Sequence, residues 1–433
     1  MLENIKQKTL PNGLKVICLK KTDTPIVSVQ IWYRVGSVCE TNGIRGISHF
    51  LEHMMFRGSH NVPSEAHAQR INDVGGHCNA FTAEDVTAYV NSVPKDCLDL
   101  ALELEAERMD GLLLDSSLLE TERKVVVEEY HTYMNNPVAK AFLEFRGEFY
   151  GQHPYAVSPL GNIEDLRIFT REDCRSYYQR WYRPDNAVLV AVGDFDSEQE
   201  VFDKVDAFFG RKTGVSGETE CRIKMPESNG AHTMRRKVDF DVPIMIYGYP
   251  APPSAHEDAL SLEILQIVLS GGETSRLHKE LVRKKSVAVM VGGLNQFLKR
   301  SGMSMFLAAF TPDMSSKKVE KELERQIELL KNNGITEQEF EKVKNTTLTS
   351  RTFELYSADN ICQRIGYGEA IEGDYRLWVK RLEALKELNR EVLVETARKY
   401  WNKSNRHLLL LKPKKVNPML YAMGMLRRVF GRF

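Results

Sequence analysis

The sequence has no excess of charge of either sign, because Lys and Arg together number 59 and Asp and Glu together also number 59. A chain that binds nucleic acid usually carries a basic domain or face, and this balance supplies none, so no nucleic acid partner is expected. The chain also lacks any run of about 18 uninterrupted apolar residues, the length that a membrane-spanning helix needs. Neither a nucleic-acid-binding protein nor an integral membrane protein is therefore predicted.

Cysteine motifs and an export signal are also missing. The seven cysteines are scattered with no C-x-x-C pair, and an odd, unpatterned set is typical of reduced thiols. The stretch from Met1 to Gln7 holds no apolar signal-peptide core. We therefore expect a cytoplasmic protein, and a periplasmic location stays open because an export signal can be trimmed from a sequence.

The most informative motif that is present runs from His49 to His53 and has the order H-x-x-E-H. On a helix, two histidines four residues apart project from one face, where neutral imidazoles can bind a single Zn²⁺. Glu52 precedes the second histidine and is placed to take a proton from a water on that metal. The alternative is a buried helix with incidental histidines, since a chance match is on the order of one in a hundred in a chain of this length.

A third metal ligand is expected, because a catalytic zinc usually takes three protein ligands and a water. The best candidates lie on a helix predicted over Ser117 to Met134. Glu122 and Glu129 are seven residues apart and share one face of that helix, whereas Glu128 points elsewhere. The alternative for these carboxylates is a solvated acidic face.

These two segments resemble the pitrilysin or insulinase peptidases, also called inverzincins, which include the mitochondrial processing peptidases. That family carries H-x-x-E-H and, roughly 75 residues later, a glutamate ligand in a segment like E-R-x-V-x-x-x-E; here Glu129 follows His53 by 76 positions. The resemblance makes His49, His53 and Glu129 the ligands of one zinc ion per chain and Glu52 the general base. It places Glu122 in support of the site without binding metal. It implies a zinc endopeptidase that acts on peptides or unfolded segments.

A further stretch, residues 75–82 (G-G-H-C-N-A-F-T), is similar to the family's G-G-x-x-N-A-x-T strand. An exposed strand edge can accept an extended peptide as an added strand. The resemblance assigns Asn79 to the substrate backbone and Phe81 to a side-chain pocket, with Ala80 between them on the same substrate-binding strand. The alternative for Phe81 is a place in the hydrophobic core.

The second half of the chain departs from the family pattern. The family usually carries an arginine and a tyrosine seven residues apart, which hold the substrate, and the matching positions here are Val282 and Val289. A related second subunit is therefore predicted to supply the arginine and tyrosine, and a homodimer is the alternative assembly. The alternatives are a slow or narrow enzyme, a non-catalytic scaffold or assembly subunit of the same fold, and a metal-binding factor without proteolysis.

The predicted elements of the second half repeat the order of the first, and a late apolar strand at His407 to Leu411 mirrors one at Val188 to Gly193. We expect an α+β protein of two similar domains, each a mainly antiparallel sheet packed with helices, as the resemblance also implies. The expected divisions are a zinc-binding peptidase domain, a linker, a homologous domain without metal, and a basic amphipathic tail: 1–212, 213–234, 235–415 and 416–433.

The tail mixes apolar side chains with Arg427, Arg428 and Arg432. This pattern is typical of a basic amphipathic helix that contacts a membrane or a partner. A helix docked on the domain, or a disordered end, is the alternative.

Overall fold

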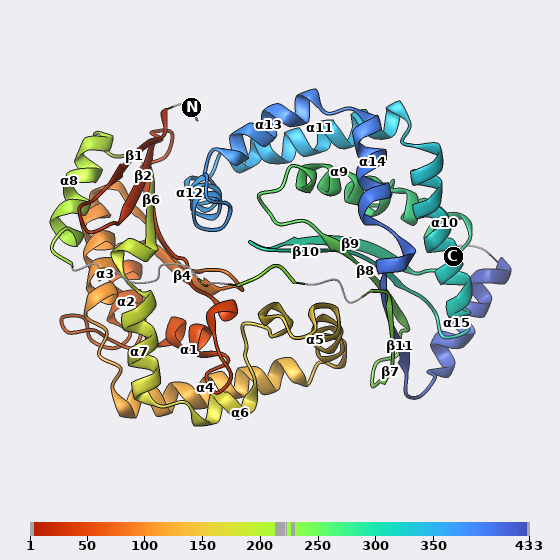
Figure 1. Ribbon diagram of the computed structural model, residues 1–433, viewed down its shortest axis with the longest axis horizontal. Helices are drawn as coiled ribbons and strands as arrows, with labels where there is room; N and C mark the ends of the chain where they lie inside the picture. Colours follow the sequence, from red (N-terminus) through yellow and green to blue (C-terminus); the bar gives the residue numbers. More distant parts are fainter. Residues whose placement is uncertain (1–3, 213–220, 222, 227–229, 431–433) are drawn as a thin grey trace. The chain divides into compact units, whose positions relative to one another are not determined.

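The computed structural model describes residues 4–212, 221, 223–226 and 230–430, and the side chains up to residue 426. The chain forms two compact units, each with its own sheet (Figure 1). Unit 1 comprises Met1–His131, Val157–Ile223 and Arg351–Lys380, and unit 2 comprises Thr132–Ala156, Lys224–Ser350 and Arg381–Phe433.

The sheet of unit 1 has six strands in the order β1-β2-β6-β3-β5-β4. Strands β2 and β6 are parallel, and every other neighbouring pair is antiparallel. Strand β4 lies at one edge, so one side of its backbone pairs with no other strand among the described residues. The strands are β1 (Lys6–Thr9), β2 (Lys15–Lys20), β3 (Ile26–Tyr33), β4 (His77–Thr82), β5 (Thr87–Pro94) and β6 (Ala187–Gly193).

The sheet of unit 2 has five strands in the order β7-β11-β8-β10-β9, with β7 and β11 parallel and the rest antiparallel. When β1 is set aside, each sheet has five strands. Numbered along the chain, these five strands lie in the spatial order first, last, second, fourth, third in both sheets. This shared order confirms the predicted α+β fold of two similar, mainly antiparallel units. The strands are β7 (His232–Val238), β8 (Ile244–Ala251), β9 (Met290–Phe297), β10 (Gly302–Ala309) and β11 (His407–Pro413).

Both faces of the first sheet are covered by helices. On one face, buried strand residues such as Ile31 pack with Phe50 of α1 and Leu102 of α3. On the other face, Trp32 and Val190 pack against α12, where Gly366 lies so close to the indole that a Cβ would overlap it. The helices of this unit are α1 (Ile47–Met54), α2 (Ala66–Asp73), α3 (Leu98–Asp110), α4 (Ser116–Met134), α6 (Ile163–Ile168), α7 (Arg171–Trp181), α8 (Glu198–Phe209) and α12 (Ala358–Tyr367).

The second sheet is packed with helices in the same manner. Helix α9 packs against β9, and α5 contacts β7 and β11 (Figure 1). The helices of this unit are α5 (Pro137–Tyr150), α9 (Asp258–Ser270), α10 (Ser316–Asn333), α11 (Glu337–Glu354), α13 (Leu377–Glu387), α14 (Arg390–Tyr400) and α15 (Pro418–Phe430), with a π-helical turn at His278–Lys284. Each sheet is thus partly covered by a helix from the other half of the chain, α12 on the first and α5 on the second.

This exchange of helices makes the compact units discontinuous in sequence, and the domain boundaries at 212 and 235 stay a prediction. Strand β7 begins at His232, inside the predicted linker 213–234. Residues 213–220, 222 and 227–229 of that linker lie outside the described residues. In unit 2, Val282 is buried in the core and the side chain of Val289 is 38% exposed.

The cysteines correct one expectation from the sequence. Cys39 and Cys221 form a disulfide with a Cα–Cα distance of 5.4 Å, so the prediction that all the thiols are reduced is wrong for this pair. The other five cysteines are free. A separation of 182 residues between the two partners hides the pair from any search for local motifs.

The tail forms helix α15 and touches unit 2 through a narrow face. Gly424 is buried against Asp313 and Thr311, whereas Met419, Met423 and Leu426 are exposed. Residues 431–433 of the predicted tail lie outside the described part. Within that part, no helix combines the length and apolar character that crossing a bilayer requires.

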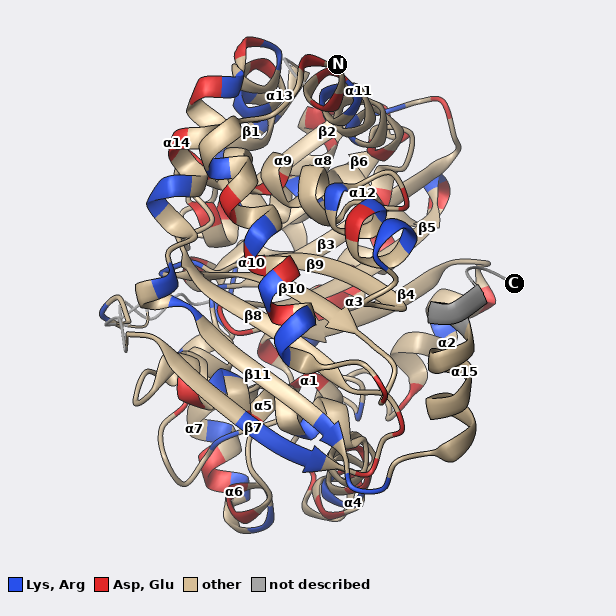
Figure 2. Ribbon diagram, turned by 90° about the vertical axis from the view of Figure 1, so that its right-hand side faces the viewer, with Lys and Arg blue, Asp and Glu red and all other residues tan. Residues whose placement is uncertain are grey.

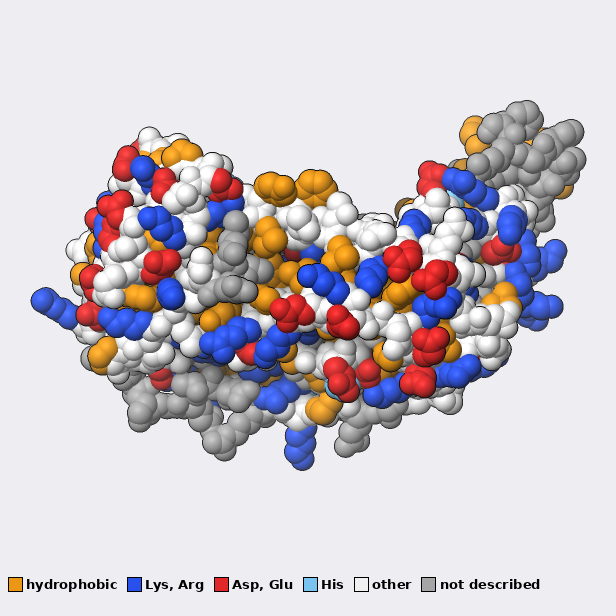
Figure 3. All heavy atoms as spheres, turned by 90° about the horizontal axis from the view of Figure 1, so that it is seen from above, with side chains coloured by type: hydrophobic (Ala, Val, Ile, Leu, Met, Phe, Trp, Pro, Cys, Tyr) orange, Lys and Arg blue, Asp and Glu red, His pale blue; other side chains and the backbone are white. Residues whose placement is uncertain are grey.

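Charged residues of both signs are spread over the elements, as the zero net charge requires. Figure 2 shows a basic stretch on β7, which is Arg235 to Lys237. On the face seen in Figure 3, apolar side chains lie scattered among acidic and basic ones.

Candidate metal centre

Helix α1 is held in place at its first turn. Gly46 precedes the helix with φ at +98°, a conformation that favours glycine. The backbone N–H groups of Gly46 and Ser48 donate to the two carboxylate oxygens of Glu40 at 2.7 and 2.9 Å. A carboxylate at this position satisfies amides that the helix itself leaves unpaired.

The two faces of α1 have different environments. Its apolar face, which includes Ile47, Phe50, Leu51 and Met54, is fully buried in the core of unit 1. Packing of this face fixes the rotation of the helix about its axis. The histidines of the H-x-x-E-H motif therefore project away from the core and toward Glu129 of helix α4.

Helix α4 brings the third donor to the two histidines. The Nε2 atoms of His49 and His53 are 3.3 Å apart, and Oε2 of Glu129 lies 3.7 Å from the first and 3.6 Å from the second. Among the described residues, these three form the one group of histidine, cysteine or acidic side chains close enough to share a metal ion, with all three donors within 4.8 Å of one another.

The donor triangle fits a tetrahedral zinc ion. Ligand atoms about 2.0 to 2.1 Å from a tetrahedral centre are separated from each other by about 3.3 Å. The measured separations of 3.3, 3.6 and 3.7 Å are close to that value. Two imidazoles and one carboxylate also match the donor set of catalytic zinc sites that keep a fourth position open.

Glu122 orients His53 from the opposite side of its ring. Its Oε1 accepts a hydrogen bond from Nδ1 of His53 at 2.8 Å, and its Oε2 accepts one from Nε of Arg57 at 2.5 Å. Because Nδ1 carries the proton, the lone pair of Nε2 faces the other two donors. The carboxylate of Glu122 is 3% exposed and Glu129 is 47% exposed, so the two carboxylates of α4 have distinct surroundings.

The histidines and Glu122 have shifted pKa values with separate causes. Burial lowers the pKa of His49 to about 4, which keeps this imidazole neutral at neutral pH. Burial also disfavours protonation of His53, but the hydrogen bond and charge of Glu122 outweigh it and raise the pKa of His53. Burial pushes the pKa of Glu122 up, and the bonds from His53 and Arg57 bring it below its ordinary value.

Glu52 lies beside the donor triangle on α1. Burial raises the pKa of Glu52 above its ordinary value, in opposition to the hydrogen bond that it accepts from Oγ1 of Thr82 at 2.6 Å. A carboxylate that is desolvated and fixed by one hydrogen bond is suited to accept a proton and release it again.

A cavity of about 720 Å³ opens beside these groups. Its lining includes Glu52, His53 and Glu122, together with Asn79 and Ala80 of the edge strand β4. Two of the three residues predicted to bind substrate therefore lie at the site.

Phe81 has a different position from its neighbours on the strand. Its ring packs edge to face on Trp32 with centroids 5.4 Å apart, and it is absent from the residues that line this cavity. The assigned role of Phe81 in a side-chain pocket stays a prediction.

Sequence reasoning missed two residues that hold the site together. Arg57 lies beyond Met54, the last residue of α1, so helical spacing could not have shown that it reaches the same carboxylate. Thr82 is the last residue of the G-G-x-x-N-A-x-T segment, and its hydroxyl donates a hydrogen bond that holds the carboxylate of Glu52. Cys78 lines the cavity without joining the donor group.

Comparison with known families identifies the chain. A model described as insulinase (peptidase family M16) matches residues 15–159, and one described as the peptidase M16 inactive domain matches residues 169–347. The two ranges together span well over half of the sequence, and the first contains the whole candidate metal centre. The chain belongs to the insulinase family of peptidases, family M16, as the resemblance in its motifs implied.

Two of the matches come from Helicobacter pylori and cover nearly the whole length of the chain. A protein named zinc protease PqqE is 29% identical over 410 residues, which is 94% of this chain and 92% of that protein. A crystal structure of a protease from the same species has a TM-score of 0.89 at 28% identity, covering 94% of this chain and 99% of that one. Proteins similar to this chain are thus named zinc proteases.

A third relative has the same fold in a longer chain. The periplasmic protease PqqL from Escherichia coli has a TM-score of 0.80 at 17% identity, and the match covers 100% of this chain but 50% of PqqL. This likeness concerns the fold alone. It shows that the architecture of this chain also occurs as half of a protein twice as long.

Proposed function

We propose that this chain is a zinc-dependent endopeptidase that hydrolyses peptides or unfolded segments. The observation that carries the proposal is the triangle of His49, His53 and Glu129 donors, with separations of 3.3 to 3.7 Å beside a buried glutamate. Membership of family M16 and the zinc proteases among its relatives support the same reaction class.

Each side chain has a separate role in the proposed reaction. A zinc ion at the triangle supplies Lewis acidity that polarises the scissile carbonyl and acidifies water. Glu52 accepts the proton of the attacking water at its carboxylate and delivers it to the amine nitrogen that leaves. Thr82 holds this carboxylate through its hydroxyl, and Glu122 keeps Nε2 of His53 directed at the site.

The substrate binds in an extended conformation along β4. The free side of this edge strand offers backbone groups to a peptide, and Asn79 and Ala80 line the cavity beside Glu52. Because backbone pairing is nearly independent of side chains, the preference for sequence is broad. An unfolded segment fits this requirement, and a folded protein does not.

The chain works with a second subunit in this proposal. Val282 and Val289 stand where the family pattern has an arginine and a tyrosine. The neighbouring arginines are already paired within unit 2, Arg276 with Glu339 and Arg283 with Glu273. A related subunit contributes the missing groups, and the double length of PqqL supports such pairing.

A non-catalytic scaffold of the same fold is the rival function. It is favoured by the match of residues 169–347 to the M16 inactive domain. The rival gains no support at the metal centre, where the donors of His49, His53 and Glu129 converge and Glu52 is present beside them.

Zinc-dependent hydrolysis of a mixed quenched-peptide library separates the two functions. The purified chain is assayed as zinc-loaded protein, after removal of metal with a chelator, and after zinc is restored, each with and without a co-expressed related subunit. An endopeptidase loses activity on chelation and regains it with zinc. A scaffold is inactive in every arm although it binds zinc.

A further inference from the structure

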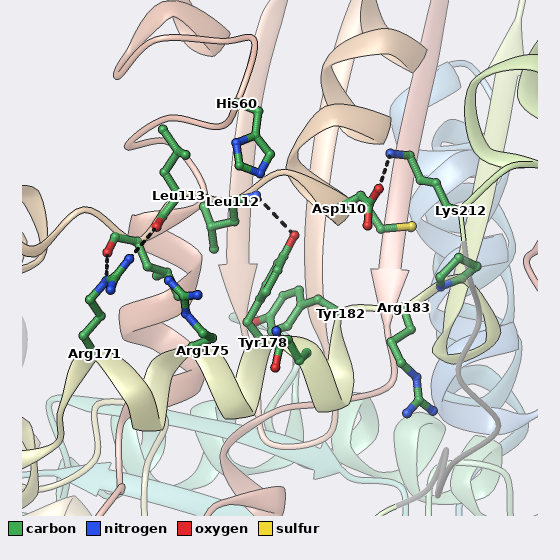
Figure 4. Close-up of a pocket in the computed structure, with 14 residues that line it drawn as sticks. His60, Asp110, Leu112, Leu113, Arg171, Arg175, Tyr178, Tyr182, Arg183 and Lys212 are labelled. Carbon is green, nitrogen blue, oxygen red and sulfur yellow. Dashed lines mark hydrogen bonds and ion pairs between the residues drawn. The ribbon is translucent and has the colours of Figure 1, made fainter.

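A second cavity lies in unit 1, apart from the metal centre, with a volume of about 430 Å³. It shares no lining residue with the cavity beside Glu52. Its walls are the loop after α1, the loop Leu112 to Leu114 that leads into α4, and helix α7 (Figure 4). The volume falls in the range of about 300 to 1,000 Å³ that is usual for small-molecule sites.

The lining of this cavity is strongly cationic. Arg171, Arg175, Arg183 and Lys212 face one carboxylate, that of Asp110. Two of the cations are matched, because Arg183 pairs with Asp185 at 3.0 Å and Lys212 lies 3.6 Å from Asp110. Among the described residues, Arg171 forms no ion pair and interacts only at longer range with the exposed carboxylate of Asp115. The charge of Arg175 has no paired carboxylate within the described part of the chain.

The guanidinium groups of Arg171 and Arg175 lie four residues apart on α7 and thus on one face, below the loop of Leu112 and Leu113 (Figure 4). Arg171 donates through Nε to the carbonyl of Leu114 at 2.6 Å and through Nη2 to the carbonyl of Leu113 at 3.5 Å, which occupies two of its five N–H groups. Arg175 makes no hydrogen bond or ion pair with any described residue. Guanidinium groups bind planar or tetrahedral oxyanions with paired N–H donors, so their unused donors point to such a ligand.

The backbone of the opposite wall is strained. Leu114 has φ at +49°, which is uncommon for a residue with a branched side chain. Arg171 holds the carbonyl of this residue, so the strain is fixed by a side chain of the cavity itself. Strained backbone of this kind occurs preferentially where a binding site must be preformed.

We propose that this cavity binds a small molecule through an oxyanion group, a phosphate or a carboxylate, held by Arg175 and Arg171. The apolar side chains of Met109 and Leu112 and the ring of Tyr178 line the remainder of the cavity and contact the body of the ligand. The proposed peptidase reaction uses none of these residues. Ligand binding in this cavity can therefore be tested separately from that reaction.

Titration with two probes tests the proposal. Inorganic phosphate and succinate are titrated into the full-length chain at constant ionic strength, and binding is followed by calorimetry and by the shift in Tm. Arg175→Gln is the diagnostic variant, because this side chain makes no hydrogen bond or ion pair in the described part of the chain. Arg167→Gln, an exposed arginine of α6 outside the cavity, is the matched control.

The expected result is saturable binding of at least one probe, weakened at least about tenfold by Arg175→Gln and unchanged by Arg167→Gln. Preference for phosphate or for succinate identifies which oxyanion the site takes. The proposal is overturned if neither probe binds at millimolar concentration, or if both arginine variants bind as the wild type does. Equal Tm values of the unliganded proteins show that each variant is folded.

Discussion

Glu129 is the most exposed of the three metal donors, and its neighbour Glu128 provides a matched comparison. Both lie on α4 and both are exposed to solvent, but only Glu129 reaches the two imidazoles. Loss of one of three ligands weakens zinc binding steeply, whereas loss of a nearby surface charge does not.

Glu129→Gln is therefore expected to lose zinc on dialysis against a weak chelator, and Glu128→Gln is expected to retain one zinc ion per chain. Metal content by atomic emission after dialysis gives the measurement. Equal zinc content in the two variants would remove Glu129 from the ligand set.

Glu339 makes a pH-dependent contribution to the stability of unit 2. Burial pushes its pKa up, but hydrogen bonds from Arg276 and from the backbone and hydroxyl of Thr336 outweigh burial and hold the pKa at about 2, against an ordinary 4.5. A depressed pKa means that the unfolded chain takes up the proton first as the pH falls. The contribution is thus complete above pH 4.5 and is lost as the pH falls toward 2.

Glu339→Gln is expected to lower the free energy of unfolding by about 1 kcal/mol near neutral pH, a value discounted because the side chain is partly exposed. The difference from wild type should shrink as the pH is lowered through about 4. Urea unfolding across this range measures it, with Glu337→Gln, which removes a more exposed partner of Arg390, as control. A difference that is independent of pH would contradict the assigned pKa.

At the level of single residues, the sequence predicted the convergence of the site because helical spacing is a local property. His49 and His53 share a face by their separation of four, and Glu122 and Glu129 by their separation of seven. The structure shows both pairs meeting, while the role of each as a ligand or support stays a prediction. The sequence could not show that Thr82 bonds to Glu52, because that contact joins a strand to a helix 30 residues away.

At the scale of the elements, the disulfide between Cys39 and Cys221 connects two distant segments of unit 1. Cys39 follows the first strands and ends a short 3-10 turn next to Glu40, which holds the start of α1. The bond to Cys221 fixes this turn to the segment Val157–Ile223 of the same unit. Cross-links that close long loops stabilise a fold mainly by restricting the unfolded chain.

Alkylation of the denatured, unreduced protein is expected to modify five thiols, and alkylation after reduction to modify all seven. Mass spectrometry counts the modified residues, and Cys221→Ser should leave Cys39 as a sixth reactive thiol. Seven reactive thiols without reduction would restore the original expectation of a fully reduced protein. A disulfide is typical of oxidising compartments, and the cytoplasmic location stays a prediction.

Element positions were predictable where the apolar pattern is strong and not where charge interrupts it. The predicted helix at 117–134 is α4, and the predicted late strands are β6 and β11. The first residues of strand β7, from His232 to Met234, fall within the predicted linker 213–234. The run of Arg235, Arg236 and Lys237 that follows them lacks the alternation that marks a strand. The exchange of α5 and α12 between the halves is also invisible to periodicity, which shows that a face is apolar but not which sheet it covers.

On the scale of the whole molecule, the sheets of the two units have the same strand order apart from β1. The candidate metal ligands and the proposed general base, however, all lie in unit 1. The first half carries the histidines and glutamates, and the second has valines where the family pattern places an arginine and a tyrosine. Donors that stabilise the transition state are worth on the order of 10² to 10³ in kcat. A chain without them is expected to be slow alone.

Co-expression with a related chain that carries this arginine and tyrosine is expected to raise kcat by about 10² or more. Replacement of those two residues by valine in the partner should abolish the gain while size-exclusion chromatography still shows the complex. A lone chain that already works at the full rate of the pair would contradict the proposed division of labour.

The central claim is that Glu52 acts on a substrate beside a metal held by His49, His53 and Glu129. The most direct test compares wild type, Glu52→Gln and the control Glu128→Gln, each loaded with one zinc ion per chain and paired with the related subunit, on the quenched-peptide library. The account predicts that Glu52→Gln keeps its zinc and loses at least about 10²-fold in kcat, while Glu128→Gln matches wild type. Wild-type rates in Glu52→Gln, or no hydrolysis by any zinc-loaded form, would contradict it.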